Sequence, residues 1–275
     1  MSNLPLEEQL RQQRNEIWSR CARASQQNTD SAKNICFLWS EAADKLLEQA
    51  FSDSFETEKV ALFALGKLGS HELNLSSDVD ILLVAEEVSS AIQSALRRFQ
   101  KLLTERTFQG FVFRVDFDLR PGGRQGPLIP TLDQFKDYYG NYGETWERMA
   151  FVRLRPLCGD VSIQTDVMDF ARKFSFRKHL DFTLLEDLKS LRGKIQGHYW
   201  ERARNNAVDL KLGVGGIRDV ELFTHALQIV HGGRNPILQI KSTSESLEKL
   251  QKAQLLPEDE ARFLNDHYWN LRTLE

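Results

Sequence analysis

Cysteine is scarce in this chain, and so are the features that would place it in a membrane or outside the cell. Cys21, Cys36 and Cys158 stand far apart and include no Cys-x-x-Cys pair. We therefore expect neither a disulfide framework nor a cysteine zinc site, and a reducing cytoplasm is the simplest location. The sequence has no apolar run close to the roughly 20 residues that span a bilayer, and its start has no apolar segment typical of a secretory signal.

An excess of charge of either sign is also missing. The 36 basic and 39 acidic residues give a formal net charge of −3, which does not favour binding to a nucleic acid. We predict neither a nucleic-acid partner nor a membrane partner. The composition is 41% hydrophobic and 27% charged, which is ordinary for a globular protein, and 275 residues are enough to bury a sizeable core.

What the chain does contain is helical periodicity, because apolar residues recur every three or four positions over most of its length. Helices are predicted at 4–51 with a turn near 26–30, at 89–107, at 132–139 and 144–154, and over most of the chain after residue 162. We expect N-terminal helices at 1–55, a central domain at 56–180 and a helical bundle at 181–275. The last helix reaches the final residue without a stop signal, as in a chain cut from a longer protein.

The stretch at 60–84, VALFALGKLGSHELNLSSDVDILLV, breaks the helical pattern and contains the first chemical signal. Two short apolar runs predict buried strands, and the turn between them contains Lys67, Gly69 and Ser70. Backbone N–H groups and a hydroxyl in such a turn can bind phosphate. Asp78 and Asp80 are two apart at the start of the second strand, so their carboxylates share a face. Paired carboxylates repel unless a cation lies between them.

A third carboxylate is predicted on another strand. In FVFRVDFDLRP, the odd positions from 111 to 119 are apolar and the even positions from 114 to 120 are charged, which indicates a half-buried strand. Asp116 and Asp118 both lie on its polar face. Two-metal phosphoryl chemistry needs such a carboxylate beside the first pair, and Mg²⁺ prefers oxygen ligands. The sequence therefore predicts a metal and phosphate site.

Each of these features has a simpler interpretation. Asp78 and Asp80 could begin a strand after a turn, and Gly69-Ser70 could be an ordinary turn. The arginines could bind phosphate, or they could lie at the surface or in local ion pairs. Those considered are Arg120, Arg124, Arg153 and Arg155. Gly215-Gly216, before a predicted helix, could bind an anion, although a tight turn is favoured.

These motifs together resemble the glutamine synthetase adenylyltransferase (glutamate–ammonia-ligase adenylyltransferase) family, within the nucleotidyltransferase superfamily that includes DNA polymerase beta. The segments that carry the likeness are GKLGSHELNLSSDVDILLV, RVDFDLRPGGRQGPL, WERMAFVRLRPLCGD and KLGVGGIRDVELFTHALQIVHGGRNPILQ. The likeness implies an α+β fold, a nucleotidyltransferase-type mixed sheet with flanking helices, followed by an all-α bundle. Asp118 stands where the family usually has arginine, so Asp116 is the better third ligand. Ser70 replaces a glycine that is common in the family.

The resemblance also implies an activity. Family proteins have two related halves, one adding AMP to a tyrosine of glutamine synthetase and one removing it by phosphorolysis with release of ADP. The segments at 211–218 and 233–236 look more like the removing half. Asp78, Asp80 and Asp116 would then hold Mg²⁺, as two ions, and the groups that bind phosphate or nucleotide would be Gly69, Ser70, Lys67, Arg120, Arg153 and Arg155.

Two other functions are consistent with the same sequence. One is AMP transfer from ATP to a tyrosine or another hydroxyl, for which the same three aspartates would serve. The other is a non-catalytic regulatory domain that binds glutamine synthetase or a PII-type signal protein through its helices. The leader before Gly66 is shorter than expected for a full-length family member, and no second nucleotidyltransferase half follows.

Overall fold

The protein is described by a computed structural model that covers residues 4–56, 58–178, 186–193, 197 and 209–275. Its contacts divide the chain into two compact units. The first unit comprises Met1–Tyr142 and Leu154–Phe170, and the second comprises Gly143–Arg153 and Ala171–Glu275. Within the described residues, no helix combines the length and the apolar character needed to cross a membrane. The domain boundaries at residues 55 and 180 stay predictions.

Two long N-terminal helices form one side of the first unit, as the periodicity predicted. They are α1 (Leu6–Gln26) and α2 (Ala32–Ser54). The Ser31 side chain accepts a hydrogen bond from the Asn34 amide, which satisfies an N–H group at the start of α2. Helix α2 buries Trp39, 1% exposed, in the main core, so the helix is held by packing rather than by its own propensity.

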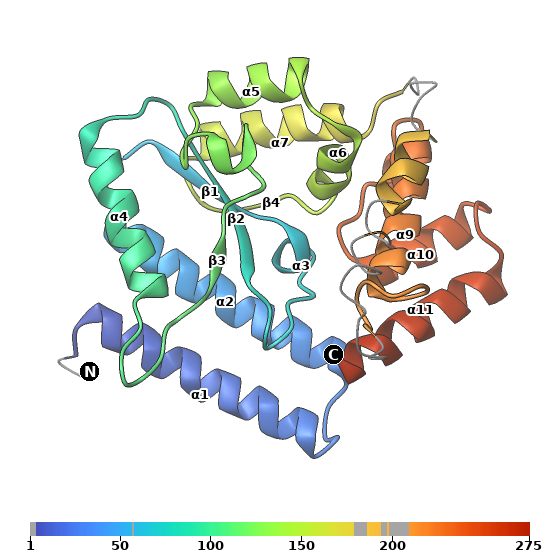
Figure 1. Cartoon of the computed structure of the whole chain (residues 1–275), viewed down its shortest axis with the longest axis horizontal. Helices are drawn as coiled ribbons and strands as arrows, with labels where there is room; N and C mark the ends of the chain where they lie inside the picture. Colours follow the sequence, from blue (N-terminus) through green and yellow to red (C-terminus); the bar gives the residue numbers. More distant parts are fainter. Residues whose placement is uncertain (1–3, 57, 179–185, 194–196, 198–208) are drawn as a thin grey trace. The chain divides into compact units, whose positions relative to one another are not determined.

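Next to these helices lies a four-stranded mixed sheet, and other helices cover its opposite face (Figure 1). Its strands are β1 (Val60–Ala64), β2 (Val79–Ala85), β3 (Val115–Asp116) and β4 (Arg155–Gly159), in the spatial order β3-β2-β1-β4. Strand β1 is antiparallel to β2 and β4, whereas β3 is parallel to β2. The C-terminal end of β1 and the N-terminal ends of the other three strands therefore lie at the same end of the sheet.

Alternate residues of the central strands build the main core. Val60, Leu62 and Ala64 of β1 are fully buried against α2 and α4 (Ser90–Thr104). Figure 1 shows α5 (Leu132–Asn141) and α7 (Val161–Ser175) on the side of the sheet opposite α2. Both faces of the sheet are covered, and this explains why β1 and β2 are almost wholly apolar runs.

The strand predicted at 111–119 is wrong in length, because only Val115–Asp116 pair with β2. Before them, the amides of Val112 and Phe113 both donate to the Leu103 carbonyl, which turns the chain away from the sheet. After them, Arg120 donates to the Phe117 carbonyl and holds a turn. Val112 and Phe113 are consecutive and both buried, so the alternation of a strand is absent in this part of the segment.

The helix predicted at 144–154 is too long by its last residues. It is α6 (Thr145–Phe151), and Arg155 begins strand β4, which the sequence did not predict. Two short 3-10 helices, η1 (Gly123–Gln125) and η2 (Pro236–Leu238), lie in the connections. The four-residue helix α3 (Gly66–Gly69) directly follows β1, where a glycine-rich turn was predicted.

The second unit is helical in its described part, as predicted. Its long helices are α9 (Ile217–Gly232), α10 (Thr243–Lys252) and α11 (Glu258–Leu274). Residues 186–193 are also helical, whereas 181–185, 194–196 and 198–208, which fall within the predicted helical bundle, lie outside the described residues. The observed architecture is thus the α+β sheet with flanking helices, followed by a helical region, that the sequence indicated.

Candidate functional site

Two of the three predicted aspartates lie directly beside each other. Asp80 of β2 and Asp116 of β3 are partners in the parallel register, with Val79 paired to Val115 one residue earlier. Paired residues on neighbouring strands project to the same face of a sheet. Both side chains are partly exposed, so the register brings two solvent-accessible carboxylates together at one edge of the sheet. Strands β1 and β4 contain no aspartate that could take either place.

Asp78 lies just outside β2, two residues before Asp80, and is exposed. Its Oδ1 accepts a hydrogen bond from Nε of Arg114, whose Nη2 also donates to the Ser76 carbonyl. The two side chains are 49% and 53% exposed, so this ion pair is in contact with solvent. Arg114 thus neutralises Asp78 at the surface. It was not among the predicted site residues, although it lies at a charged position of the alternating segment.

Gly66 connects the glycine turn to the aspartates. Its φ of +52° is in the left-handed region, which favours glycine. A Cβ atom at this position would lie 2.0 Å from Oδ2 of Asp80, so the carboxylate occupies the space that any side chain would fill. The Leu65 amide also donates to the Asp80 carbonyl over 2.9 Å. The turn predicted to bind phosphate and the predicted metal ligand are therefore in direct contact.

The other turn residues make hydrogen bonds within the turn and to the segment between it and β2. Lys67 is buried, and its Nζ lies 3.4 Å from Oγ of Ser77 on the segment that leads into β2. The Ser70 hydroxyl lies 3.2 Å from the Lys67 carbonyl and 3.3 Å from the Glu72 carboxylate. The Gly69 amide donates to the Leu65 carbonyl. These contacts shape α3 and hold it against β2.

The arginines predicted to bind phosphate are in different surroundings. Arg120 is buried and donates to the carbonyls of Phe117 and Gly126, which closes the loop after β3. Asp118 accepts a hydrogen bond of 2.7 Å from Arg124, and that bond raises the pKa of Arg124. Asp118 is therefore paired within this loop, whereas Asp116 accepts the Asp118 amide and keeps its place in the register.

Arg155, at the start of β4, lies against the glycine turn. Its Nη2 donates to Oδ1 of Asp44 over 2.9 Å and to the Leu68 carbonyl over 3.1 Å. The guanidinium thereby joins α2 to α3. Ala64, at the end of β1, is the register partner of Arg155. Gly66 follows two residues later, so Arg155 lies beside the point where the chain enters the turn. Strands β4 and β2 pair with opposite sides of β1. Arg155 therefore supports the turn from β4, and the aspartates lie on the β2 side.

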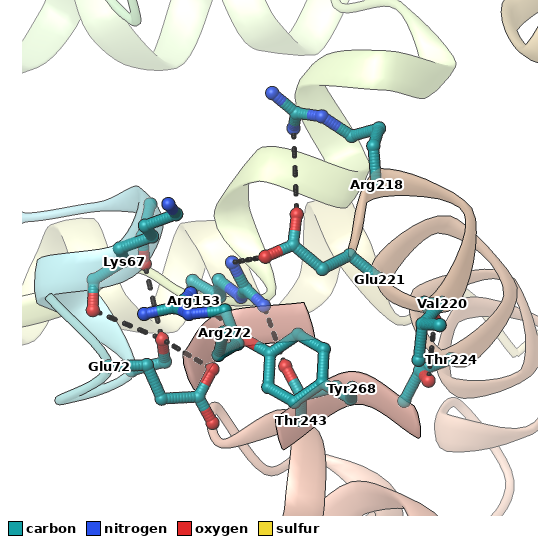
Figure 2. Close-up of polar contacts among 12 residues, drawn as sticks. Lys67, Glu72, Arg153, Arg218, Val220, Glu221, Thr224, Thr243, Tyr268 and Arg272 are labelled. Atoms are coloured by element: carbon teal, nitrogen blue, oxygen red, sulfur yellow. Dashed lines mark hydrogen bonds and ion pairs between the residues drawn. The ribbon is translucent and has the colours of Figure 1, made fainter. Parts of the chain in front are cut away.

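Arg153 belongs to the second unit and is buried there. Its Nη1 donates to Glu221 of α9 over 3.1 Å, and its Nη2 donates to Thr243 over 2.7 Å. Figure 2 shows the Glu221 carboxylate between Arg153 and Arg218, whose Nη1 lies 3.9 Å away. Burial alone would raise the pKa of Glu221, but Arg153 and Arg218 outweigh it and hold that pKa well below its usual range. These contacts join Arg153 to helices α9 and α10 and stabilise their packing in the second unit.

A cavity of about 310 Å³ lies in the second unit, and the three predicted aspartates are not among its lining residues. Residues that line it form two hydrogen bonds, from Thr145 to Asp187 over 2.8 Å and from Trp146 to Glu144 over 2.9 Å. Its lining also includes arginines. We place the candidate site at the aspartates, because the size of a cavity says less about metal and phosphate chemistry than a set of oxygen ligands does.

The chemistry of the donor set fits magnesium. Asp80 and Asp116 offer hard oxygen atoms at one end of the sheet, and a glycine turn of the kind that can accept phosphate touches Asp80, whereas the Asp78 carboxylate is paired with Arg114. The arrangement suits the transfer of a phosphoryl or nucleotidyl group, because such reactions depend on positioning and charge stabilisation.

Comparison with known proteins yields matches to both parts of the chain. The family model described as glutamate-ammonia ligase adenylyltransferase matches residues 5–169, which is more than half of the chain. A second model, GlnD PII-uridylyltransferase, matches residues 189–275.

Three relatives share the name bifunctional glutamine synthetase adenylyltransferase/adenylyl-removing enzyme. The protein from Nitrosococcus oceani is 37% identical over 75% of this chain and 22% of its own length. The protein from Rhizobium meliloti is 36% identical over 78% of this chain and 23% of its own. The protein from Agrobacterium fabrum is 33% identical over 80% and 23%. The chain thus matches less than a quarter of the length of each.

Proposed function

Because the chain belongs to the glutamate-ammonia ligase adenylyltransferase family, we propose that it removes AMP from an adenylylated tyrosine of glutamine synthetase by metal-dependent phosphorolysis. The observation that carries the proposal is the register pairing of Asp80 with Asp116, beside the Gly66 turn. The names of the relatives include an adenylyl-removing activity. The segments at 211–218 and 233–236 favour removal over addition.

In the proposed reaction, an oxygen of orthophosphate attacks the phosphorus of the tyrosine-bound AMP. The bond between that phosphorus and the tyrosine oxygen breaks, and the tyrosine oxygen takes up a proton. The products are ADP and the unmodified tyrosine. Magnesium, when bound, would supply positive charge to the phosphate oxygens and to the leaving oxygen. The protein would contribute mainly position and electrostatic stabilisation.

Asp78, Asp80 and Asp116 would hold the metal, and each has a distinct structural support. Asp116 accepts a hydrogen bond of 2.7 Å from the Asp118 amide, which orients its carboxylate. Asp80 is fixed by its contact with Gly66. Asp78 would exchange its ion pair with Arg114 for the metal, which a solvent-exposed pair allows at low cost.

We propose that Lys67, Gly69 and Ser70 shape the phosphate-binding turn rather than each contacting phosphate. The contacts of Lys67 and Ser70 with neighbouring groups support this role. Arg155 would hold the turn in place through the Leu68 carbonyl. Arg120 and Arg153 would act through the fold, since the contacts of Arg120 close a loop and those of Arg153 join helices.

Glutamine synthetase would be the protein substrate, and ATP, ADP and phosphate would be the small molecules of the reaction in either direction. A PII-type signal protein is a further proposed partner, supported by the match of residues 189–275 to GlnD PII-uridylyltransferase. The relatives that bear the activity in their names are much longer chains, so activity of this chain alone is part of the proposal.

The proposal is tested by incubating the chain with phosphate, Mg²⁺ and glutamine synthetase that carries radiolabelled AMP on tyrosine. Phosphate-dependent release of labelled ADP is the expected result. Labelling of the unmodified enzyme from ATP would instead favour the AMP-transfer alternative. Binding without either product would favour a regulatory domain. Asp78→Asn should abolish ADP release without unfolding the protein, and unchanged turnover in that variant would refute the assignment.

A further inference from the structure

A second set of side chains that can bind a metal occurs in the first unit and includes none of the three aspartates. Glu41 and Asp44 lie one turn apart on α2, and His71 follows α3 in the chain. One ligand atom from each lies within 4.8 Å of the other two. An imidazole nitrogen and two carboxylate oxygens, supplied by two separate segments, form a donor set that differs in kind from the all-oxygen set at the sheet edge.

The spacing of these atoms, in the contacts of an imidazole with two carboxylates, also fits the ligands of a metal ion. Nδ1 of His71 lies 3.4 Å from Oε1 of Glu41 and 4.0 Å from Oδ2 of Asp44. An N–H···O hydrogen bond in a protein spans about 2.7–3.2 Å. Two ligands of a tetrahedral zinc ion, with bonds of about 2.0–2.1 Å, lie roughly 3.3–3.4 Å apart. The His71–Glu41 separation matches this value, and a small side-chain rotation would bring Asp44 to it.

Acidic side chains follow one another at intervals of one turn on this part of α2. Glu48 lies on the same helix, one turn beyond Asp44. Its pKa is raised by burial and then by the charge of Asp44, with a smaller contribution from Glu41, although Arg155 and Lys45 oppose the rise. Arg155 and Lys45 thus offset part of the negative charge of the two carboxylates.

The neighbouring thiol does not belong to the donor set. Burial, followed by the charges of Glu48 and Asp44, raises the pKa of Cys158 to about 12. Cys158 is also not among the residues whose ligand atoms lie together in the set. The ligands are thus one nitrogen and two carboxylate oxygens, a combination that suits zinc.

The ligands are held in place by their surroundings and remain accessible. Arg155 Nη2 lies 2.9 Å from Asp44, and hydrogen bonds of this kind orient the carboxylates that bind metals. The Phe37 ring, with its centroid 5.8 Å from that of His71, covers one side of the imidazole. The His71 and Glu41 side chains are 29% and 44% exposed, so an ion can reach them from solvent.

We propose that Glu41, Asp44 and His71 bind one zinc ion, which joins α2 to the segment that follows the glycine turn. The site would be structural, because His71 comes directly after Gly69-Ser70, and a metal bridge to α2 would restrain that turn. Water would complete the coordination. The proposal does not depend on the proposed function, since it concerns binding by residues outside the aspartate set.

Zinc binding by the whole 275-residue chain tests the proposal, with a chromophoric chelator as competitor and excess Mg²⁺ present to occupy the aspartates. His71→Ala and Glu41→Gln should each weaken zinc binding by about 10- to 100-fold. The matched controls are His231→Ala, which removes a histidine of α9, and Asp80→Asn, which removes a carboxylate of the sheet edge. Both controls should bind one zinc ion as tightly as the parent protein does.

Circular dichroism checks that each variant is folded. If His71→Ala does not fold, the more conservative Glu41→Gln decides the question alone, since that side chain is 44% exposed. Equal zinc affinity in the parent, His71→Ala and Glu41→Gln proteins would overturn the proposal. So would a parent protein without a tight zinc site, or loss of the site in Asp80→Asn with retention in Glu41→Gln.

Discussion

The two units use the same kind of ion pair, an acid with an arginine, in opposite ways. In the first unit, Asp78 and Arg114 form an ion pair whose side chains are 49% and 53% exposed. In the second, Glu221 and Arg153 form a pair in which both side chains are 6% exposed. An exposed pair is worth about 0–1 kcal/mol and exchanges readily, whereas breaking a buried one costs several kcal/mol. The difference indicates that Asp78 is available to a ligand and that Glu221 is committed to the fold.

The largest expected effect on stability is therefore that of Glu221→Gln. The change removes the Glu221 carboxylate from the buried Arg153 guanidinium, and we expect a loss of about 3–5 kcal/mol in the free energy of unfolding. Urea titration followed by circular dichroism measures it. Glu258→Gln is the control, because that carboxylate is 76% exposed in its pair with Arg262 and its loss should change stability by less than about 0.5 kcal/mol. Equal effects would remove the contrast between the units.

Acid should destabilise the second unit through a buried histidine and a buried carboxylate. Burial lowers the pKa of His225 to about 3, with Arg153 adding to the shift. Below about pH 6.5 the unfolded chain takes up a proton at this histidine that the folded protein does not, so stability falls as the pH drops from about 6.5 towards 3. Glu221, whose pKa is depressed in the fold, adds to the loss below about pH 4.3.

Urea titrations at several values between about pH 7.5 and about pH 4.5 measure this slope. His225→Gln should flatten the part of the curve between about pH 6.5 and 4.5, and His231→Gln should leave it unchanged. A slope that persists in His225→Gln would show that another group is responsible.

Gly66→Ala should have a smaller effect on stability, of about 1–3 kcal/mol, because it combines a left-handed φ with an overlap onto Asp80. It should also displace the Asp80 carboxylate and reduce ADP release. Gly140→Ala is the matched control. Gly140 lies in α5, and no side chain or other segment lies within 4 Å of the position that an added Cβ would take. Alanine there should be neutral or stabilise by up to about 1 kcal/mol. A stable and active Gly66→Ala protein would contradict the contact.

Arg114→Gln should have the smallest effect on stability, below about 1 kcal/mol, because its partner is exposed. The same change should strengthen Mg²⁺ binding, since the metal no longer competes with a guanidinium for Asp78. Magnesium titration monitored by calorimetry measures this effect. Weaker binding in the variant would indicate that Arg114 supports the site instead of competing for it.

The sequence was sufficient to predict the central strands and two neighbouring carboxylates. The apolar runs of β1 and β2 are buried on both faces, and such runs are visible in a sequence. The alternation around Asp116 correctly placed that residue on a strand beside Asp80, although it overstated the length of β3. The polarity of the side chains identified which face of the strand carries the carboxylate. The length of a strand, however, depends on which backbone groups find hydrogen-bond partners on the neighbouring strand.

The contacts between distant residues could not be predicted. Strand β4 has no alternation, and Pro156 within it has no N–H group to donate. Arg155 meets Asp44 across 111 residues, and Arg153 meets Glu221 across 68. Nothing local distinguishes an arginine that binds phosphate from one that joins two helices. These roles depend on topology, which the spacing of residues in the sequence does not reveal.

The proposed chemistry depends above all on Asp116, the register partner of Asp80, being the third metal ligand in place of Asp118. The most direct measurement compares Asp116→Asn with Asp118→Asn in phosphate-dependent ADP release from adenylylated glutamine synthetase. We predict a loss of about a thousandfold for Asp116→Asn, which corresponds to several kcal/mol of transition-state stabilisation. Asp118→Asn, which removes the ion pairs with Arg124 and Arg120 in the loop after β3, should retain activity within about tenfold. Equal activities, or a larger loss for Asp118→Asn, would contradict this assignment.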